Sequence, residues 1–197
     1  MSPGKRIADE HRKYELLPDQ QVVVGGMTVY RIRALKDFSK VKAGALGGFI
    51  ASERNLSQLG DCWVFDEAQV YEQAVVSDGA QIRGRACVHG HARVSDKGQV
   101  LGNAEVFEHG WIFKSGMVFD NAKVFGYAQV RDKGMVFSNA VISGHVRVLG
   151  HGQVAGEARI NGKTVVGGHE TVSRRLSRVP PTSVGSGRPR SPRGPRP

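Results

Sequence analysis

The chain has 197 residues, 40% of them hydrophobic, and its 26 glycines and many valines favour strands and tight turns over helices. No run reaches the roughly 18 apolar residues that a transmembrane helix requires, and the charged N-terminus lacks the apolar segment of a signal peptide. The two cysteines have no metal-ligand spacing. We therefore expect an all-β, cytoplasmic protein with no metal and no membrane association.

The net charge of +10 is concentrated at the C-terminus. Seven arginines and no acid lie in residues 173–197, and subtracting seven from ten leaves about +3 for the rest of the chain. The Arg/Pro-rich segment 179–197 cannot bury a core, so a disordered tail is predicted there. Such a tail could bind nucleic acid or another polyanion weakly. The arginines concerned are Arg174, Arg175, Arg178, Arg188, Arg190, Arg193 and Arg196.

The N-terminal part of the chain predicts a hairpin rather than a separate domain. Residues 1–13 are interpreted as a mobile charged arm. The apolar runs 21–24 and 27–32 flank Gly25-Gly26, which is typical of a β-hairpin with a two-residue turn. We expect residues 14–59 to cap one end of the repeat region that follows them.

From Gly60 to Asn161 the chain divides into seventeen hexads without one insertion. The fifth position is Val or Ile in all seventeen, and the third is Ala in ten and Gly in five. Because alternate residues of a strand point the same way, positions 3 and 5 would face a core and positions 4 and 6 would face outward. The first two positions, rich in Gly, Asp and Asn, would form corners.

A strand and a corner every six residues describe a triangular coil. With the degenerate hexad GKTVVG (162–167), residues 60–167 would form six such coils. A β-helix exposes its core and an unpaired strand edge at each end, so both ends require covers. Residues 168–178 could form a short capping helix at the C-terminal end.

These hexads resemble those of the hexapeptide-repeat left-handed β-helix proteins. The leader YRIRALKDFSKVKAGALGGFIASERNLSQLGDCWVF, followed by the hexads, is similar to bacterial and prophage proteins of unestablished function that carry the label of hexapeptide-repeat acetyltransferases. This closer resemblance covers residues 14–161. It implies a single-stranded left-handed parallel β-helix, and among oligomeric states it favours a homotrimer.

Residues 18 apart should stack into columns, so the outward positions can be read as faces. On the first face, built from the hexads that begin at residues 60, 78, 96, 114, 132 and 150, five apolar residues fall together: Leu101, Met117, Phe119, Met135 and Phe137. A contiguous outward apolar patch usually marks an interface. Aromatic stacking that merely supports the sheet is the alternative explanation.

Three histidines, His91, His109 and His145, fall in one corner column of the third face. The resemblance implies a role for such a residue, because a histidine near a subunit interface acts as general base in hexapeptide acyltransferases, beside a groove for coenzyme A. Histidine suits that task because its ordinary pKa lies near neutrality. Exposed polar corner residues without a catalytic role are the alternative.

The chain also departs from the acyltransferase pattern. The residue after the aliphatic one is often Phe rather than a small or acidic residue, and no loop interrupts the hexads to shape an active site. We therefore predict a non-enzymatic scaffold or binding protein without a cofactor. It would form a homo-oligomer, a trimer or else a dimer, and could bind an unidentified protein partner. The rival function is an acetyl-CoA-dependent acyltransferase.

Overall fold

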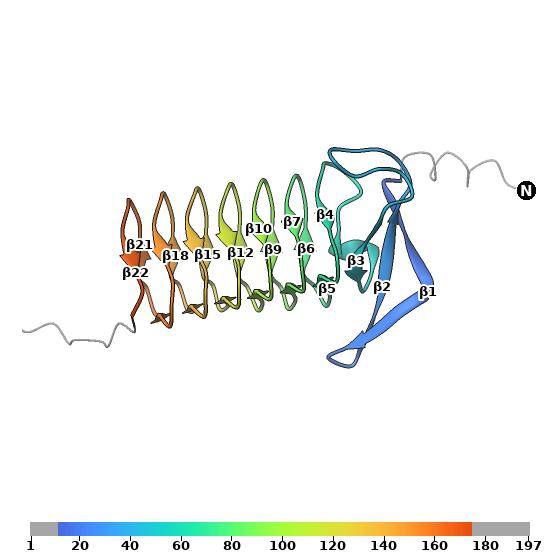
Figure 1. Cartoon of the computed structure of the whole chain (residues 1–197). Helices are drawn as coiled ribbons and strands as arrows, with labels where there is room; N and C mark the ends of the chain where they lie inside the picture. The colour runs from blue at the N-terminus through green and yellow to red at the C-terminus, as the bar shows by residue number, and fades with distance from the viewer. Residues whose placement is uncertain (1–11, 175–197) are drawn as a thin grey trace, which may run out of the picture.

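The computed structural model describes residues 12–174. Over this range the chain is all-β apart from one 3-10 turn, η1 (Glu53–Asn55). The nineteen strands from β4 to β22 are two residues long, one to each hexad. From β4 onward each strand pairs in parallel with the strand 18 residues before or after it, as in Gln81↔Gln99↔Met117. The result is a row of stacked coils, the predicted parallel β-helix (Figure 1).

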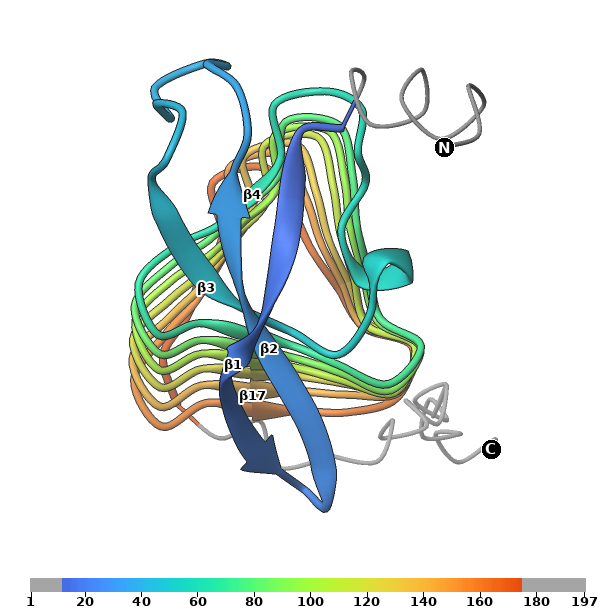
Figure 2. The same cartoon turned by 90° about the vertical axis from the view of Figure 1, so that its right-hand side faces the viewer.

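Three sheets make up the three faces of the coil (Figure 2). The first face has seven strands: β4 (Trp63–Val64), β7 (Gln81–Ile82), β10 (Gln99–Val100), β13 (Met117–Val118), β16 (Met135–Val136), β19 (Gln153–Val154) and β22 (Thr171–Val172). The coil part of the second face has β5 (Gln69–Val70), β8 (Cys87–Val88), β11 (Glu105–Val106), β14 (Lys123–Val124), β17 (Val141–Ile142) and β20 (Arg159–Ile160). The third face has β6 (Val75–Val76), β9 (Arg93–Val94), β12 (Trp111–Ile112), β15 (Gln129–Val130), β18 (Arg147–Val148) and β21 (Val165–Val166). Seen from the N-terminal end, the chain turns anticlockwise as it recedes, so the coil is left-handed (Figure 2).

Every corner uses the same backbone conformation. The first residue of each hexad from Gly60 to Gly168 has a left-handed φ, between 53° at Glu108 and 92° at Gly162. Glycine adopts this conformation without steric cost, and Asp tolerates it better than most residues. Where the corner residue is acidic, its carboxylate usually accepts a hydrogen bond from the backbone N–H one coil further on. The Gly126 N–H, for example, lies 3.0 Å from Oε2 of Glu108.

The core runs along the axis of the coil and consists of positions 3 and 5. The residues predicted to be buried are all fully buried: Ala68, Val70, Ala86, Val88, Ala104, Val106, Ala122 and Val124. Glycine replaces alanine where the backbone comes too close for a side chain. A Cβ at position 116 would lie 2.3 Å from the carbonyl oxygen of Val130. The third position is therefore small because the interior of the coil has no room for more.

A hairpin crosses the N-terminal end of the coil (Figures 1 and 2). Strands β1 (Tyr14–Val24) and β2 (Met27–Ala34) pair antiparallel around Gly25-Gly26. Strand β2 pairs antiparallel with β3 (Leu46–Ile50), and β3 pairs in parallel with β5. The sheet of the second face thus continues into the hairpin, and the edge of the first coil on this face is already paired.

The side chains beneath the hairpin close the end of the core. Trp63 occupies an outward hexad position but is only 1% exposed, because the rings of Tyr14 and Phe38 pack edge-on against it at 6.1 and 5.3 Å. Lys13 is also 1% exposed, and its Nζ donates to the carbonyl oxygen of Cys62 at 2.9 Å and lies 3.3 Å from Sγ of Cys62. Burial lowers the pKa of Lys13 and raises that of Cys62.

The C-terminal end differs from expectation. Instead of a helix over 168–178, the described part of this segment forms one more hexad and contributes β22. Gly168 takes the left-handed corner, Thr171 pairs with Gln153, and the ring of His169 stacks on His151 at 4.9 Å. Continued stacking on a finished coil satisfies the backbone hydrogen bonds that a helix would have left unpaired on the sheet edge. Residues 175–197, including the predicted tail, lie outside the described residues.

Ala104→Leu should test the packing of the core. The extra methylenes have no space at this fully buried position, so we expect the free energy of unfolding to fall by about 1–3 kcal/mol. Urea denaturation followed by circular dichroism measures it. Lys97→Leu at an exposed corner is the control and should change stability little. Equal stability of the two variants would contradict the close packing of the core.

Candidate functional site

Two ladders of stacked rings flank the corner between the second and third faces. On the second face, the rings at hexad position 6 stack face to face at 4.9, 5.2 and 4.7 Å in the order Tyr71, His89, Phe107 and Phe125. We call this the aromatic ladder. On the third face, the rings at position 2 stack at 5.1, 4.7 and 5.2 Å in the order His91, His109, Tyr127 and His145. We call this the histidine ladder.

The histidine ladder contains all three histidines that the sequence singled out. His91, His109 and His145 are exposed and lie in one column, with the exposed ring of Tyr127 between the last two. Both ring faces of His109 and one ring face each of His91 and His145 are covered by neighbouring rings. The imidazole edges, which carry the nitrogen atoms, are therefore the polar parts that a ligand could reach. The column could therefore exchange hydrogen bonds or protons with a bound molecule.

A shallow depression of about 750 Å³ lies over the first part of these ladders. It is lined by Glu72, Gln73, His89, Gly90, His91, Phe107, Glu108, His109 and Tyr127. Most of its walls are rings, and its carboxylates belong to corner residues. The Oε2 atom of Glu72 accepts the N–H of Gly90 at 2.6 Å, and Glu108 is held in the same way. Both carboxylates therefore serve the corners as well as lining the depression.

The aromatic ladder contains an ionic cluster that sequence reasoning missed. His89 is sandwiched between Tyr71 and Phe107, and its Nε2 lies 3.1 Å from Oε1 of Glu105. Nζ of Lys123 donates to Oε2 of Glu105 at 2.6 Å. Burial opposes the charged form of Glu105, but the hydrogen bonds from Lys123 and His89 outweigh it, so its pKa lies below the ordinary value. Reading position 6 of the second face at intervals of 18 would have revealed this ladder.

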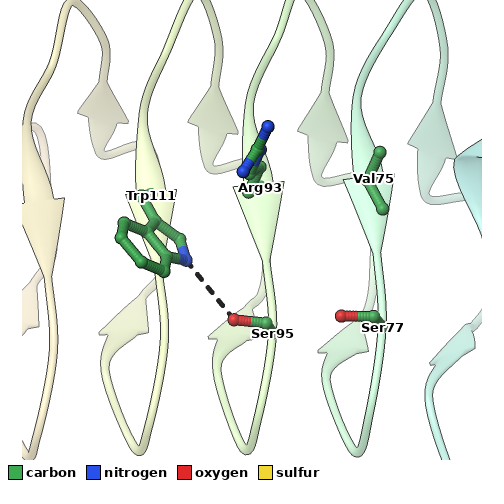
Figure 3. A pocket seen from close by; sticks show the side chains of 5 residues that line it. All are labelled: Val75, Ser77, Arg93, Ser95 and Trp111. Carbon is green, nitrogen blue, oxygen red and sulfur yellow. Dashed lines mark hydrogen bonds between the residues drawn. The ribbon is translucent and has the colours of Figure 1, made fainter.

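A second depression, of about 370 Å³, lies on the N-terminal half of the third face (Figure 3). Its lining residues are Val75, Ser77, Arg93, Ser95 and Trp111. The indole N–H of Trp111 donates to Oγ of Ser95 on the preceding coil at 3.3 Å. Figure 3 shows that the side chains of Arg93 and Trp111 extend from neighbouring strands of one sheet. A third depression, of about 430 Å³, lies further along the same face and is lined by Tyr127, Gln129, His145, Arg147 and Lys163.

The five predicted interface residues do lie together on the first face. Met117 and Met135 are register partners on adjacent strands, and the rings of Phe119 and Phe137 stack at 4.9 Å with only 2° between their planes. Leu101 precedes Phe119 in the same column. All five are half-buried, because each covers part of its neighbour in the column. We call these residues the apolar patch.

The asparagines at position 2 of the second face, Asn103, Asn121 and Asn139, form a ladder of hydrogen bonds. Nδ2 of Asn103 donates to Oδ1 of Asn121, and Nδ2 of Asn121 donates to Oδ1 of Asn139, both at 3.1 Å. Asn139 in turn donates to Oε1 of Glu157 at 2.6 Å. These hydrogen bonds engage the side chains along one corner of the second face, so the column has a structural role.

The remaining predicted sites are not built by the described residues. Of the seven arginines proposed to bind polyanions, Arg174 is the last residue described, and the other six lie outside the described residues. Within residues 12–174 no group of three or more His, Cys, Asp and Glu residues could hold a metal ion. Nor does this part of the chain contain a helix long and apolar enough to cross a bilayer.

Lys123→Met should raise the pKa of Glu105, because it removes the shorter of the two side-chain hydrogen bonds that favour the carboxylate. An NMR titration of the side-chain carboxyl carbon measures this shift. The depressed pKa in the folded state stabilises the wild type above the ordinary value of 4.5, and that stability is lost as the pH falls through the lower folded value. The variant should lose less stability on acidification. Lys97→Met is the matched control, and an unchanged Glu105 titration in Lys123→Met would contradict the assignment.

Comparison with known proteins finds a partial match. No family model matches the chain. A segment of 86 residues, 43% of the chain, is 33% identical to the uncharacterized acetyltransferase YdcK of Escherichia coli (strain K12). The chain covers only 26% of the length of that relative. The uninterrupted hexads, the triangular coil of parallel strands and this partial match fit the hexapeptide-repeat β-helix family that the sequence resembles.

Proposed function

We propose that the protein is a non-enzymatic β-helix scaffold that self-associates through the apolar patch of its first face. The observation that carries this proposal is the patch itself: five large apolar side chains on three successive coils, half-buried and continuous. Scattered exposed apolar residues are ordinary, whereas a contiguous patch marks a contact surface. The second and third faces, which carry charged and polar residues, would remain available to partners.

The energetics favour association. Complete burial of a large apolar side chain contributes roughly 1.5–3 kcal/mol, and about half of that remains to be gained by residues already half-buried. Five such residues per subunit supply several kcal/mol to each contact. The patch extends along the coil axis, so copies would associate side by side. Closed cyclic symmetry is the usual solution for such contacts, and we propose a trimer about an axis parallel to the coil.

Phe119→Asp combined with Phe137→Asp should convert the oligomer into a folded monomer. Two carboxylates in the centre of the contact would have to be desolvated without partners, while the core beneath them is unchanged. Light scattering coupled to size-exclusion chromatography at micromolar concentration measures the mass, and circular dichroism checks the β-structure. Phe107→Asp with Phe125→Asp is the matched control, because this pair also stacks, at 4.7 Å, but on the second face.

Two results would contradict the scaffold proposal in its present form. A monomeric wild type would show that the apolar patch does not drive self-association. An oligomer that survives the first-face substitutions but dissociates with the second-face pair would place the contact on the second face instead.

A second candidate function, acyl transfer from acetyl-CoA, has a specific observation in its favour. His91, His109 and His145 share one exposed ladder beside an open depression, and the partial relative carries the name of an acetyltransferase. Against it, the nineteen hexads contain no loop that would enclose a substrate. A histidine edge would act as general base on an acceptor hydroxyl or amine.

Calorimetric titration with acetyl-CoA distinguishes the two functions. The scaffold proposal expects no saturable heat at micromolar protein concentration. Saturable binding that is lost in His91→Ala with His109→Ala, and retained in His151→Ala on the first face, would replace the scaffold with the acyltransferase.

A further inference from the structure

Between its corners, the third face carries only positive charge. This face takes the hexads that begin at residues 72, 90, 108, 126, 144 and 162. Their outward positions, which are positions 2, 4 and 6, include no acid. They do include four cations, Arg93, Arg131, Arg147 and Lys163, besides the histidine ladder. The second face, by contrast, mixes Arg85, Lys123 and Arg159 with Glu67, Glu105 and Glu157 at the equivalent positions.

Three of the four cations on the third face are available to a ligand. Arg93, Arg147 and Lys163 are exposed, and no hydrogen bond or ion pair to another residue of 12–174 holds their side chains. Arg93 and Arg147 lie in one column of the sheet, three strands apart, with Trp111 and Gln129 between them. At about 4.8 Å per strand the two guanidinium groups are about 14 Å apart along the axis.

The carboxylates at the two edges of this face are occupied. Glu72 and Glu108 at one edge accept backbone N–H groups one coil further on. At the other edge, the carboxylate of Asp78 accepts the backbone N–H of Asp96, and the carboxylate of Asp96 accepts the backbone N–H of Lys114. The carboxylate of Asp132 forms an ion pair with Nζ of Lys114 at 3.0 Å. These hydrogen bonds and the ion pair orient the corner carboxylates toward neighbouring coils. None of the corner acids forms an ion pair with Arg93, Arg147 or Lys163.

Trp111 adds an aromatic surface to this column. One side of the indole packs against the ring of Phe113 at 4.2 Å, and the N–H group is held by Ser95, so the orientation of the side chain is set. The residue is nevertheless 38% exposed and forms a wall of the depression beside Arg93 (Figure 3). A large ring fixed in place but open to solvent is a platform on which a planar group can stack.

We propose that the third face binds single-stranded nucleic acid along the coil axis. Phosphates would contact Arg93, Arg147 and Lys163, and one base would stack on Trp111. Positive charge along a track together with an aromatic platform is the combination by which proteins bind single strands without sequence preference. A single strand is favoured over a duplex because stacking on Trp111 requires an unpaired base, and the flat face has no element that enters a groove.

This site is separate from the apolar patch, which lies on the first face, and from the arginines at the C-terminus. Self-association through the first face would leave the third face open and would array several such tracks in one particle. The proposal does not depend on the oligomer, since every residue that it uses belongs to one chain.

The test is a titration of the full chain with an oligothymidylate of about ten nucleotides at several salt concentrations. Fluorescence anisotropy of the labelled strand reports affinity, and intrinsic fluorescence reports stacking. The chain has two tryptophans, and Trp63 is buried beneath the hairpin, so quenching by the strand reports Trp111. Trp111→Ala should weaken binding about fivefold or more and abolish the quenching, and Trp111→Phe should restore part of the affinity.

Arg93→Ala with Arg147→Ala should weaken binding and reduce the slope of log affinity against log salt by about 1.4, which is about 0.7 for each phosphate that an arginine no longer neutralises. The matched control is Arg85→Ala with Arg159→Ala, which removes the same charge from two exposed positions on the second face. It should leave the slope and the quenching unchanged. Circular dichroism verifies that all variants are folded.

Three outcomes would overturn the proposal. Binding without quenching, with equal slopes in the two double variants, would place the nucleic acid elsewhere, with the C-terminal arginines as the first alternative. No binding of the oligothymidylate at low salt would exclude this ligand. Binding of polygalacturonate in its place, abolished by Arg93→Ala with Arg147→Ala, would assign the third face to an acidic polysaccharide.

Discussion

The left-handed corner at every sixth residue is the constraint on which the rest of the structure depends. It turns the chain through the same bend nineteen times between Gly60 and Gly168, and no insertion breaks the rhythm. Residues 18 apart therefore stack in register, and side chains of the same type on successive coils contact one another. The aromatic, histidine and asparagine ladders follow from this single repetition, as does the carboxylate-to-amide hydrogen bond that supports several of the corners.

A coil of this kind has little capacity for an enclosed active site. Its interior is filled by Ala, Gly, Val and Ile, and its depressions are open and lined by side chains from successive coils. What the fold provides instead is three flat faces whose chemistry is set independently, because each face takes a different third of the hexads. Here the first face is apolar at its centre, the second is mixed in charge and the third is basic.

The fold could be predicted from the sequence because it depends on residue types that recur every six positions: a small residue at position 3 and Val or Ile at position 5. The apolar patch and the histidine ladder could be located for the same reason. The helix predicted over 168–178 is absent from the described part of that segment, which is a hexad that pairs with β19. This hexad keeps Gly168 at position 1 and Val172 at position 5, but Glu170 at position 3 obscures it. The burial of Trp63 and Lys13 could not be foreseen, since both depend on a hairpin that is not part of the repeat.

The position of that hairpin has a consequence for synthesis. It precedes the coils in the chain, so a ribosome completes the segment that covers Trp63 before it delivers most of the hexads. Each later coil contacts chiefly the coil before it. The strands of the last completed coil set the register of the next coil, and their side chains continue into the same columns. The coils can therefore be laid down one by one in the order of translation, with an already ordered surface as template. On the second face, where β3 already pairs with β5, new coils extend the sheet at its C-terminal end only.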